Sequence, residues 1–260
     1  MMIGFKKSVV SVACAGALFS SLSLSGSAPA APAETAPAEL TSAIAAIEAA
    51  ANAQNIDQLM ALYGSDFIGP DDFTRDRYQT TLSEFWAQYS ALTYDVELLS
   101  WEMNGDVLVA ETLTTITGTQ SIDGRDLALT STVESRQNYA GGQIVAQTIL
   151  SEQTQLMSGT MPPTVDVRLA ETVAPGETFS FDAIVAEPLG DRLLLGVAVN
   201  EGVTAEDFLT PRPLNLEALS AGGLFKIGTA SDKPDQRWVS AVLISDDGIF
   251  IDTRRLSVEE

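Results

Sequence analysis

The stretch TYDVELLSWEMNGDVLVAETLTTITGTQSIDG, residues 93–124, decides the fold expected of this 260-residue chain. Apolar and polar side chains alternate along most of it, which is the two-residue period of a half-buried β-strand. Asn104-Gly105 and Asp123-Gly124 supply the turn residues between strands. The pattern continues to Gln155, so we predict a meander of long, twisted antiparallel strands over residues 93–155.

Helical periodicity precedes this sheet. Apolar residues recur at three- and four-residue spacing from residue 39, and Asn55 offers a fresh N-cap for a short helix over 57–63. A further helix is expected over 74–89, with an apolar stripe that is more typical of core than of a ligand site. That stripe contains Tyr78, Leu82, Phe85, Trp86 and Tyr89. Helices packed on a curved sheet form a cone, so we predict an α+β cone over residues 39–159.

The segment 158–163, SGTMPP, breaks the strand pattern and marks the predicted domain boundary. Beyond it the sequence alternates between short strand-like runs and turns. The strand-like runs are 164–168, 178–185, 192–199, 226–227, 238–245 and 248–257. This spacing predicts a C-terminal all-β sandwich over residues 164–260.

The N-terminus has the order of a secretory signal peptide. Lys6 and Lys7 precede an apolar run over 9–24, and Ala28-Pro29-Ala30 supplies a small-residue cleavage site. We therefore expect cleavage after Ala30, a flexible Ala/Pro-rich tether over 31–38, and a periplasmic or extracellular location without a stable membrane anchor. An uncleaved anchor and lipidation at Cys14 are the alternatives.

The amino-acid composition limits the kinds of binding and catalytic sites that the chain can form. The chain has 14 basic and 35 acidic side chains, a formal charge of −21, which disfavours binding to nucleic acids. It has no histidine, and its one cysteine lies in the predicted signal peptide. No metal site with calcium-loop or cysteine spacing is present, and no nucleotide-binding loop follows Gly222-Gly223. We therefore expect no cofactor and no metal.

Three motifs resemble the nuclear transport factor 2-like superfamily, and within it the SnoaL-like and ketosteroid-isomerase-like domains. They are AIEAAANAQNIDQLMALYGSDF at 46–67, GDVLVAETLTTITGTQSIDG at 105–124 and GQIVAQTILSEQT at 142–154. The resemblance covers less than half of the chain and implies a cone fold with a central pocket. Enzymes of this superfamily place an Asp or a His/Asp pair in the cone, and the histidine is missing here.

Candidate site residues follow from the cone. Aromatic side chains could line an apolar ligand pocket, or they could simply fill the core. These are Tyr63, Phe67, Trp86, Tyr89 and Trp101.

Two charged residues, Glu134 and Arg136, share one face of a predicted strand because they are two residues apart. On a concave face they could form an acid/base pair; on a convex face they are surface charges. Asp66 is the remaining catalytic candidate by its position after the second helix, with Tyr63 as hydrogen-bond donor.

Three functional hypotheses are therefore open. The first is a secreted, non-catalytic protein whose cone binds a small apolar ligand, or whose sheet pairs with a second copy. The second is a carboxylate-driven isomerase, dehydratase or cyclase, in which burial raises the pKa of Asp66 or Glu134. The third is an envelope interaction module that docks a partner through residues 222–238.

Overall fold

The fold was analysed in a computed structural model that describes residues 30–89, 91–122, 124–188, 193–203, 214–219 and 222–260. The predicted signal peptide, apart from Ala30, lies outside the described residues. The helices are α1 (Ala38–Asn52), α2 (Ile56–Ala61) and α3 (Arg75–Ala87), with two 3-10 turns, η1 (Ala33–Thr35) and η2 (Pro70–Asp72). The strands are β1 (Ala31–Pro32), β2 (Tyr63–Ile68), β3 (Ala91–Asn104), β4 (Val107–Ile122), β5 (Arg125–Ala140), β6 (Gln143–Gly159), β7 (Val165–Leu169), β8 (Thr172–Val173), β9 (Thr178–Val185), β10 (Leu194–Gly202), β11 (Glu217–Ala218), β12 (Gly223–Thr229), β13 (Asp235–Ser245) and β14 (Gly248–Val258).

The predicted meander is confirmed. Strands β3, β4, β5 and β6 pair antiparallel in sequence order, with tight connections between them. The two-residue period of the sequence is also the period of side-chain burial. On β5, for example, Leu127, Leu129 and Ser131 are buried while Ala128 and Thr130 are exposed. The three predicted helices are present, and they pack with the sheet around one hydrophobic cluster. The N-terminal part is therefore an α+β fold with helices on an antiparallel sheet.

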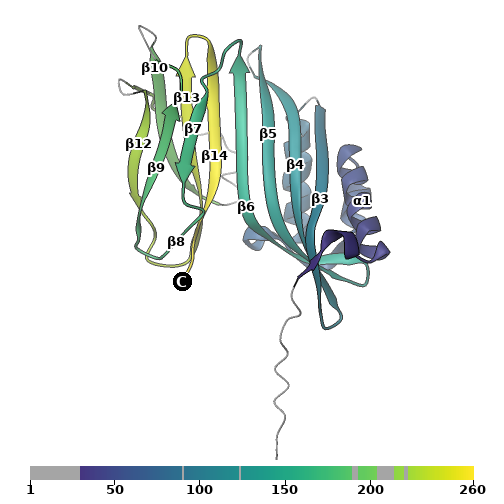
Figure 1. The fold of residues 1–260 in the computed structure, drawn as a ribbon. Helices are drawn as coiled ribbons and strands as arrows, with labels where there is room; N and C mark the ends of the chain where they lie inside the picture. Colours follow the sequence, from purple (N-terminus) through teal and green to yellow (C-terminus); the bar gives the residue numbers. More distant parts are fainter. Residues whose placement is uncertain (1–29, 90, 123, 189–192, 204–213, 220–221) are drawn as a thin grey trace, which may run out of the picture.

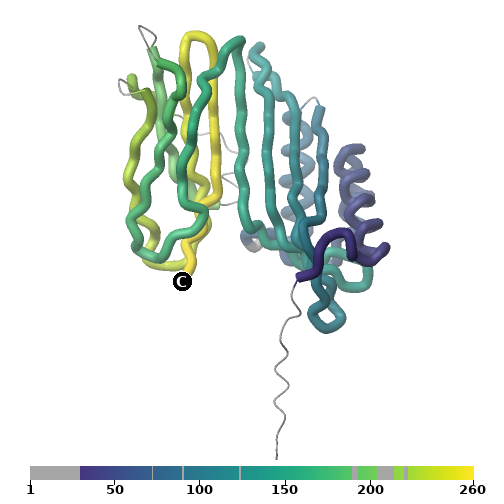
Figure 2. The backbone as a smooth tube through the Cα atoms, viewed as in Figure 1, coloured from purple at the N-terminus to yellow at the C-terminus, as the bar shows by residue number. Residues whose placement is uncertain are grey.

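The large sheet does not stop at the predicted domain boundary. Strand β6 pairs with β5 along one edge and with β14 along the other, from Gly159↔Gly248 to Gln153↔Arg254. Strands β13, β10 and β11 continue the same sheet beyond β14. Figure 2 shows these neighbouring strands side by side from β3 to the yellow C-terminal hairpin. Both parts of the chain therefore share one backbone hydrogen-bond network.

Opposite faces of this sheet are covered by different layers. The helices pack on the face behind the long strands in Figure 1, and the three-stranded sheet β12-β9-β7 lies in front of β13 and β14. A second hydrophobic cluster joins the small sheet to the C-terminal strands, with Phe181, Leu243 and Leu256 among its most buried members. One of the two layers in the C-terminal part belongs to the large sheet that also contains β3 to β6. A separate C-terminal sandwich therefore remains a prediction.

Two segments differ from their predicted conformations. Residues 31–38, predicted as a flexible tether, begin with β1, which pairs with β3, and with η1, where Thr35 accepts a hydrogen bond from the Trp101 indole at 3.1 Å. Residues 63–68, predicted as a helix end and a turn, form strand β2 instead. Tyr63 pairs parallel with Ile144 of β6, so backbone pairing outweighs the local turn signal there.

Helix α1 covers the open edge of β3. The Asn52 side chain donates to the Tyr94 carbonyl and accepts from the Tyr94 amide, both at 2.8 Å, and Glu48 accepts from the Val96 amide at 3.0 Å. These contacts satisfy edge groups that would otherwise need water or another strand. They also fix the distance between the helix and the sheet.

Replacing Asn52 with Ala should therefore lower the free energy of unfolding by about 1 to 3 kcal/mol, because a backbone donor and a backbone acceptor lose their partner. Asn52→Asp keeps the acceptor for the Tyr94 amide and should lose less. Urea unfolding of the three proteins measures the order. Equal losses in both variants would contradict this role for the amide.

Candidate functional site

A cavity of about 470 Å³ lies between the helices and the large sheet. Its wall is mostly apolar and aromatic. Helix α3 supplies the complete stripe Tyr78, Leu82, Phe85 and Trp86, continued by Tyr89 just beyond the helix, and strands β3 to β6 supply the floor. The stripe predicted as core does pack in the hydrophobic cluster, and it also forms the roof of the cavity. Residues far along the chain also reach the wall, namely Val203, Trp238 and Arg255.

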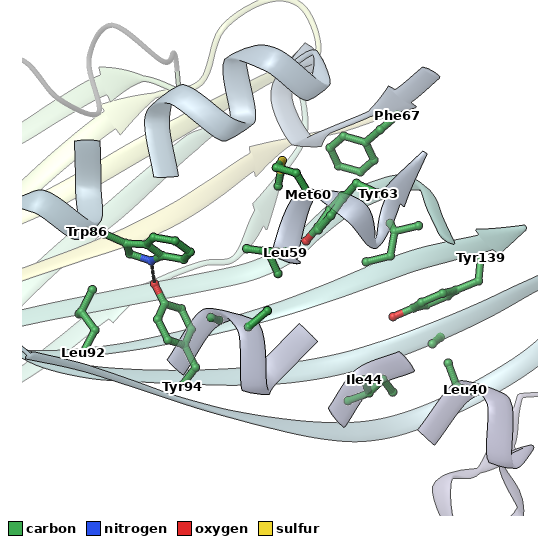
Figure 3. Packing of buried hydrophobic residues seen from close by; sticks show 14 of the residues in the cluster. Leu40, Ile44, Leu59, Met60, Tyr63, Phe67, Trp86, Leu92, Tyr94 and Tyr139 are labelled. Atoms are coloured by element: carbon green, nitrogen blue, oxygen red, sulfur yellow. Dashed lines mark hydrogen bonds between the residues drawn. The ribbon is translucent and has the colours of Figure 1, made fainter. Parts of the chain in front are cut away.

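Hydrogen bonds hold the aromatic side chains in place. The Trp86 indole donates to the Tyr94 hydroxyl at 2.8 Å, which links α3 to β3 (Figure 3). The Tyr63 and Tyr78 rings pack at a tilt with centroids 5.4 Å apart, and Phe67 packs edge-on against Tyr63 with ring centroids 4.8 Å apart. A ligand in the cavity would therefore meet a preformed aromatic surface, because these rings are fixed by polar contacts as well as by packing.

Burial keeps these phenols neutral. Desolvation is the main cause that raises the pKa of Tyr63, Tyr78, Tyr94 and Tyr139. The neighbouring Tyr78 raises the pKa of Tyr63 further, and a hydrogen bond from Trp86 only partly offsets the burial of Tyr94. At neutral pH these side chains act as hydrogen-bonding groups and cannot serve as bases.

The floor of the cavity has polar groups within its apolar surface. Tyr139 donates to the Gln137 amide oxygen at 2.5 Å, and the hydroxyls of Ser135 and Thr112 are 3.2 Å apart. Gln147 lies directly opposite Gln137 on β6, and its buried amide oxygen accepts no hydrogen bond among the described residues. An unfilled buried acceptor costs about 1 to 3 kcal/mol, so a ligand donor or a water molecule at Gln147 would be favourable.

A buried ionic cluster forms the wall on the C-terminal side. The Arg255 side chain, only 4% exposed, donates to both oxygens of Asp71 at 2.9 Å each and to Glu152 Oε2 at 3.3 Å. It also donates to Gln236 at 3.3 Å, and the Trp238 indole donates to Glu152 at 3.1 Å. Burial disfavours the charge of Arg255, but Asp71 and Glu152 outweigh it and raise the pKa of the guanidinium. Arg255 is therefore a permanent cation within the wall.

The cluster depends on two local features of the backbone. Asp71 has a left-handed conformation (φ 54°, ψ 39°) in η2, which Asp tolerates better than most residues. On β6 the pairing with β5 is irregular, because Glu134 opposes Ser151 while Ser135 opposes Ile149. The extra residue, Leu150, reverses the alternation, so Gln147 and Ile149 line the cavity before it and Glu152 lines the cavity after it.

Three of the predicted pocket aromatics lie on the cavity wall: Tyr63, Trp86 and Tyr89. Phe67 is buried behind Tyr63 and does not contribute to the wall. Trp101 lies away from the cavity, where its indole contacts Thr35.

The predicted charged candidates are all outside the cavity wall. Asp66 is exposed on β2, next to the exposed Ser65 and the buried Phe67. Arg136 and Glu134 are on the sheet face opposite to the one that lines the cavity with Ser135 and Gln137. Arg136 is half-exposed and pairs with Glu111 at 2.6 Å, which is the main cause that lowers the Glu111 pKa. This pair is a surface ion pair, the second of the two alternatives considered for that face.

Sequence reasoning did not identify the polar part of the wall. Asp71 lies in the 3-10 turn η2, where an acidic residue gives no signal for a site. Glu152, Trp238 and Arg255 carried no local signal for a site, because their contacts span up to 103 residues among themselves and 184 residues from Arg255 to Asp71. Among the described residues, no group of three or more Asp, Glu, His or Cys side chains is placed to hold a metal ion.

Comparisons with known proteins match parts of the chain. A family model described as "Domain of unknown function (DUF8623)" matches residues 160–259. No curated protein matches the chain. None of the helices in the described ranges has the length and apolar character needed to cross a membrane.

Several solved structures are similar to this chain at low identity. An LEH-like epoxide hydrolase of Mycobacterium tuberculosis is 16% identical, with a TM-score of 0.30 over 43% of this chain and 80% of the other. A protein of ketosteroid isomerase-like fold from Catenulispora acidiphila is 18% identical (TM-score 0.30; 44% and 85% covered). An NTF2-like protein of unknown function from an Exiguobacterium species is 17% identical (TM-score 0.31; 43% and 95% covered). The last two carry the names of the group that the sequence motifs resemble; likeness this distant says nothing about activity.

Replacing Arg255 with Leu should lower the free energy of unfolding by about 3 to 5 kcal/mol, because two carboxylates at the cavity wall lose their cation. Arg136→Leu removes an arginine from an exposed ion pair and should cost less than about 1 kcal/mol. Urea unfolding at pH 7 compares the two variants. Similar small losses would show that the Arg255 cluster contributes little to stability.

All five tyrosines have a raised pKa, so the phenolate absorbance near 295 nm should stay low in the folded protein at pH 10, the ordinary pKa of tyrosine. In the unfolded state the phenols lose protons from that pH upward, so stability should be constant below it and fall above it. A titration with and without denaturant measures this. A folded-state midpoint equal to the denatured one would contradict the burial.

Proposed function

We propose that this chain binds a small, mostly apolar molecule in the cavity between its helices and its large sheet, without catalysis. The observation that carries the proposal is the cavity itself. Its volume of about 470 Å³ falls within the range of small-molecule sites, and aromatic and aliphatic side chains dominate its wall. Hydrogen bonds such as Trp86 to Tyr94 fix that wall before any ligand enters.

The polar groups on the wall indicate what such a molecule would carry. The Gln147 amide oxygen needs a donor, and the hydroxyls of the cavity phenols can exchange hydrogen bonds with a ligand. A flat apolar body with a hydroxyl group would satisfy these groups while covering the aromatic rings. This is the apolar ligand expected from the sequence, with one polar requirement added.

The placement of the carboxylates supports binding rather than carboxylate-driven catalysis. Asp66 and Glu134 do not reach the cavity, and Asp71 uses both carboxylate oxygens to hold Arg255. Glu152 would be the remaining wall carboxylate for an isomerase-type mechanism, and it already accepts from Trp238 and Arg255. The catalytic hypothesis therefore loses both of its original acid/base candidates.

Location and partners are further parts of the proposal. The N-terminal sequence pattern supports export with cleavage after Ala30, and thus a ligand met in the periplasm or outside the cell. Pairing with a second copy through the sheet is the alternative use of the cone part. The measured N-terminus and mass of the exported protein test the first point, and its sedimentation behaviour tests the second.

A cavity-filling variant tests the binding site directly. Thr114 lies on the cavity wall in β4, whereas Thr117 is exposed on the other face of the same strand. We expect 2-(1-naphthyl)ethanol, an apolar probe with one hydroxyl, to bind the wild-type protein with one site per chain in isothermal titration calorimetry. Thr114→Trp should weaken this binding at least tenfold, because the indole occupies ligand space.

The matched control, Thr117→Trp, makes the same substitution three residues away and should change the affinity less than twofold. Near-wild-type melting temperatures for both variants would show that each one folds. Equal affinities in all three proteins would place the probe elsewhere, and no binding by the wild type would reject the proposed site.

A further inference from the structure

The charge of the cavity wall is unbalanced. Among its described residues only Asp71, Glu152 and Arg255 carry charge, two negative against one positive. The surrounding protein adds to this potential, since the whole chain has a formal charge of −21. A ligand in the cavity therefore experiences a net negative field in a region with little water to screen it.

The donors of Arg255 are directed at its protein partners. Four of its five N–H groups donate to Asp71, Glu152 and Gln236 at 2.9 to 3.3 Å, and the nitrogen of the fifth, Nη2, lies 3.3 Å from Glu152 Oε2. An anionic ligand would have to break a buried bidentate ion pair to reach the guanidinium. The structure thus disfavours recognition of a carboxylate or phosphate at this end of the cavity.

Both carboxylate oxygens of Asp71 accept hydrogen bonds from Arg255, but only one oxygen of Glu152 is used in this way. Its contacts from Trp238 and Arg255 all fall on Oε2, while Oε1 accepts no hydrogen bond among the described residues. The Glu152 side chain is 17% exposed and lies on the cavity wall beside the Trp238 ring. An oriented carboxylate oxygen next to aromatic faces is a favourable environment for an organic cation.

We propose that the cavity takes an apolar molecule with a protonated amine, and that Glu152 Oε1 accepts from this amine beside Trp238. This deepens the proposed function and rests on it. Arg255 and Trp238 act as positioning residues, because they hold Oε2 and so direct Oε1 to the cavity. The C-terminal strands then supply part of the recognition site, although the ligand body lies in the cone.

Two probes that differ only in charge test this inference. 2-(1-Naphthyl)ethylamine is protonated at pH 7, and 2-(1-naphthyl)ethanol is its neutral counterpart. By calorimetry we expect the wild-type protein to bind the amine at least tenfold more tightly than the alcohol. Glu152→Gln should reduce this preference to twofold or less, because the amine loses its charged acceptor while Gln can still accept from Trp238 and Arg255.

The matched control is Glu134→Gln, which removes the same charge from the opposite face of the neighbouring strand. It should leave the tenfold preference intact. Equal loss in Glu134→Gln and Glu152→Gln would overturn the inference, because the preference would then come from overall charge. Equal binding of both probes by the wild type would also overturn it, but would leave the proposed apolar site standing.

A second variant tests the inference if the melting temperature of Glu152→Gln shows that this protein does not fold. Asp71→Asn neutralises the other wall carboxylate, and Asn tolerates the left-handed conformation at this position. It should also reduce the amine preference, because the wall then has no net charge. An unchanged preference in Asp71→Asn would count against the inference, and binding of neither probe by the wild type would reject the proposed function together with it.

Discussion

The hydrogen-bonded ladder between β6 and β14 is the constraint on which the rest of this structure depends. It joins a strand of the N-terminal meander to the last strand of the chain, from Gly159↔Gly248 to Gln153↔Arg254. Without it the two parts of the chain would be separate units, and the Arg255 side chain would not reach the cavity wall. Continuing the register beyond Arg254↔Gln153 places Arg255 opposite Glu152, and side chains at directly opposite positions of paired strands project from the same face. The family model that matches residues 160–259 therefore describes a segment that contributes directly to the cavity of the preceding part.

The two faces of the large sheet carry different chemistry, and this separation explains the organisation of the site. The face toward the helices has apolar side chains, phenols and the Arg255 cluster. The opposite face of β13 and β14 packs on the small sheet and holds a second buried charge, Asp252, which accepts from Gln153, Gln155 and Arg254. Both clusters follow the same rule, since each charge taken from water is surrounded by several charge-assisted hydrogen bonds. The Arg255 cluster borders the cavity between the helices and the large sheet, and for that reason it is the one with a proposed role in recognition.

Much of the architecture was predictable because strand and helix periods are local properties. The long strands, their turns and the α3 stripe were all predicted within a few residues of their observed bounds. The stripe packs in the core cluster as predicted, but its spacing could not show that it also borders a cavity, since the same spacing describes a helix on a filled core and a helix over a cavity. Asp66 and Glu134 illustrate a second limit. Both were acid/base candidates within the predicted cone, yet Asp66 is exposed on β2 and Glu134 lies on the face of β5 that points away from the cavity.

The sequence by itself determined the periods, turns and composition, and hence an α+β unit built on a long antiparallel meander with an acidic, histidine-free chemistry. The tertiary structure alone decided which charges meet. One extra residue, Leu150, shifts the alternation of β6 and turns Glu152 inward, and no local pattern marks such a bulge because it exists only relative to the partner strand. Asp71 and Arg255 are 184 residues apart in the sequence and become neighbours only when β14 pairs with β6 in the folded protein. The cavity and its polar end are therefore products of strand register, which depends on contacts that the sequence does not display locally.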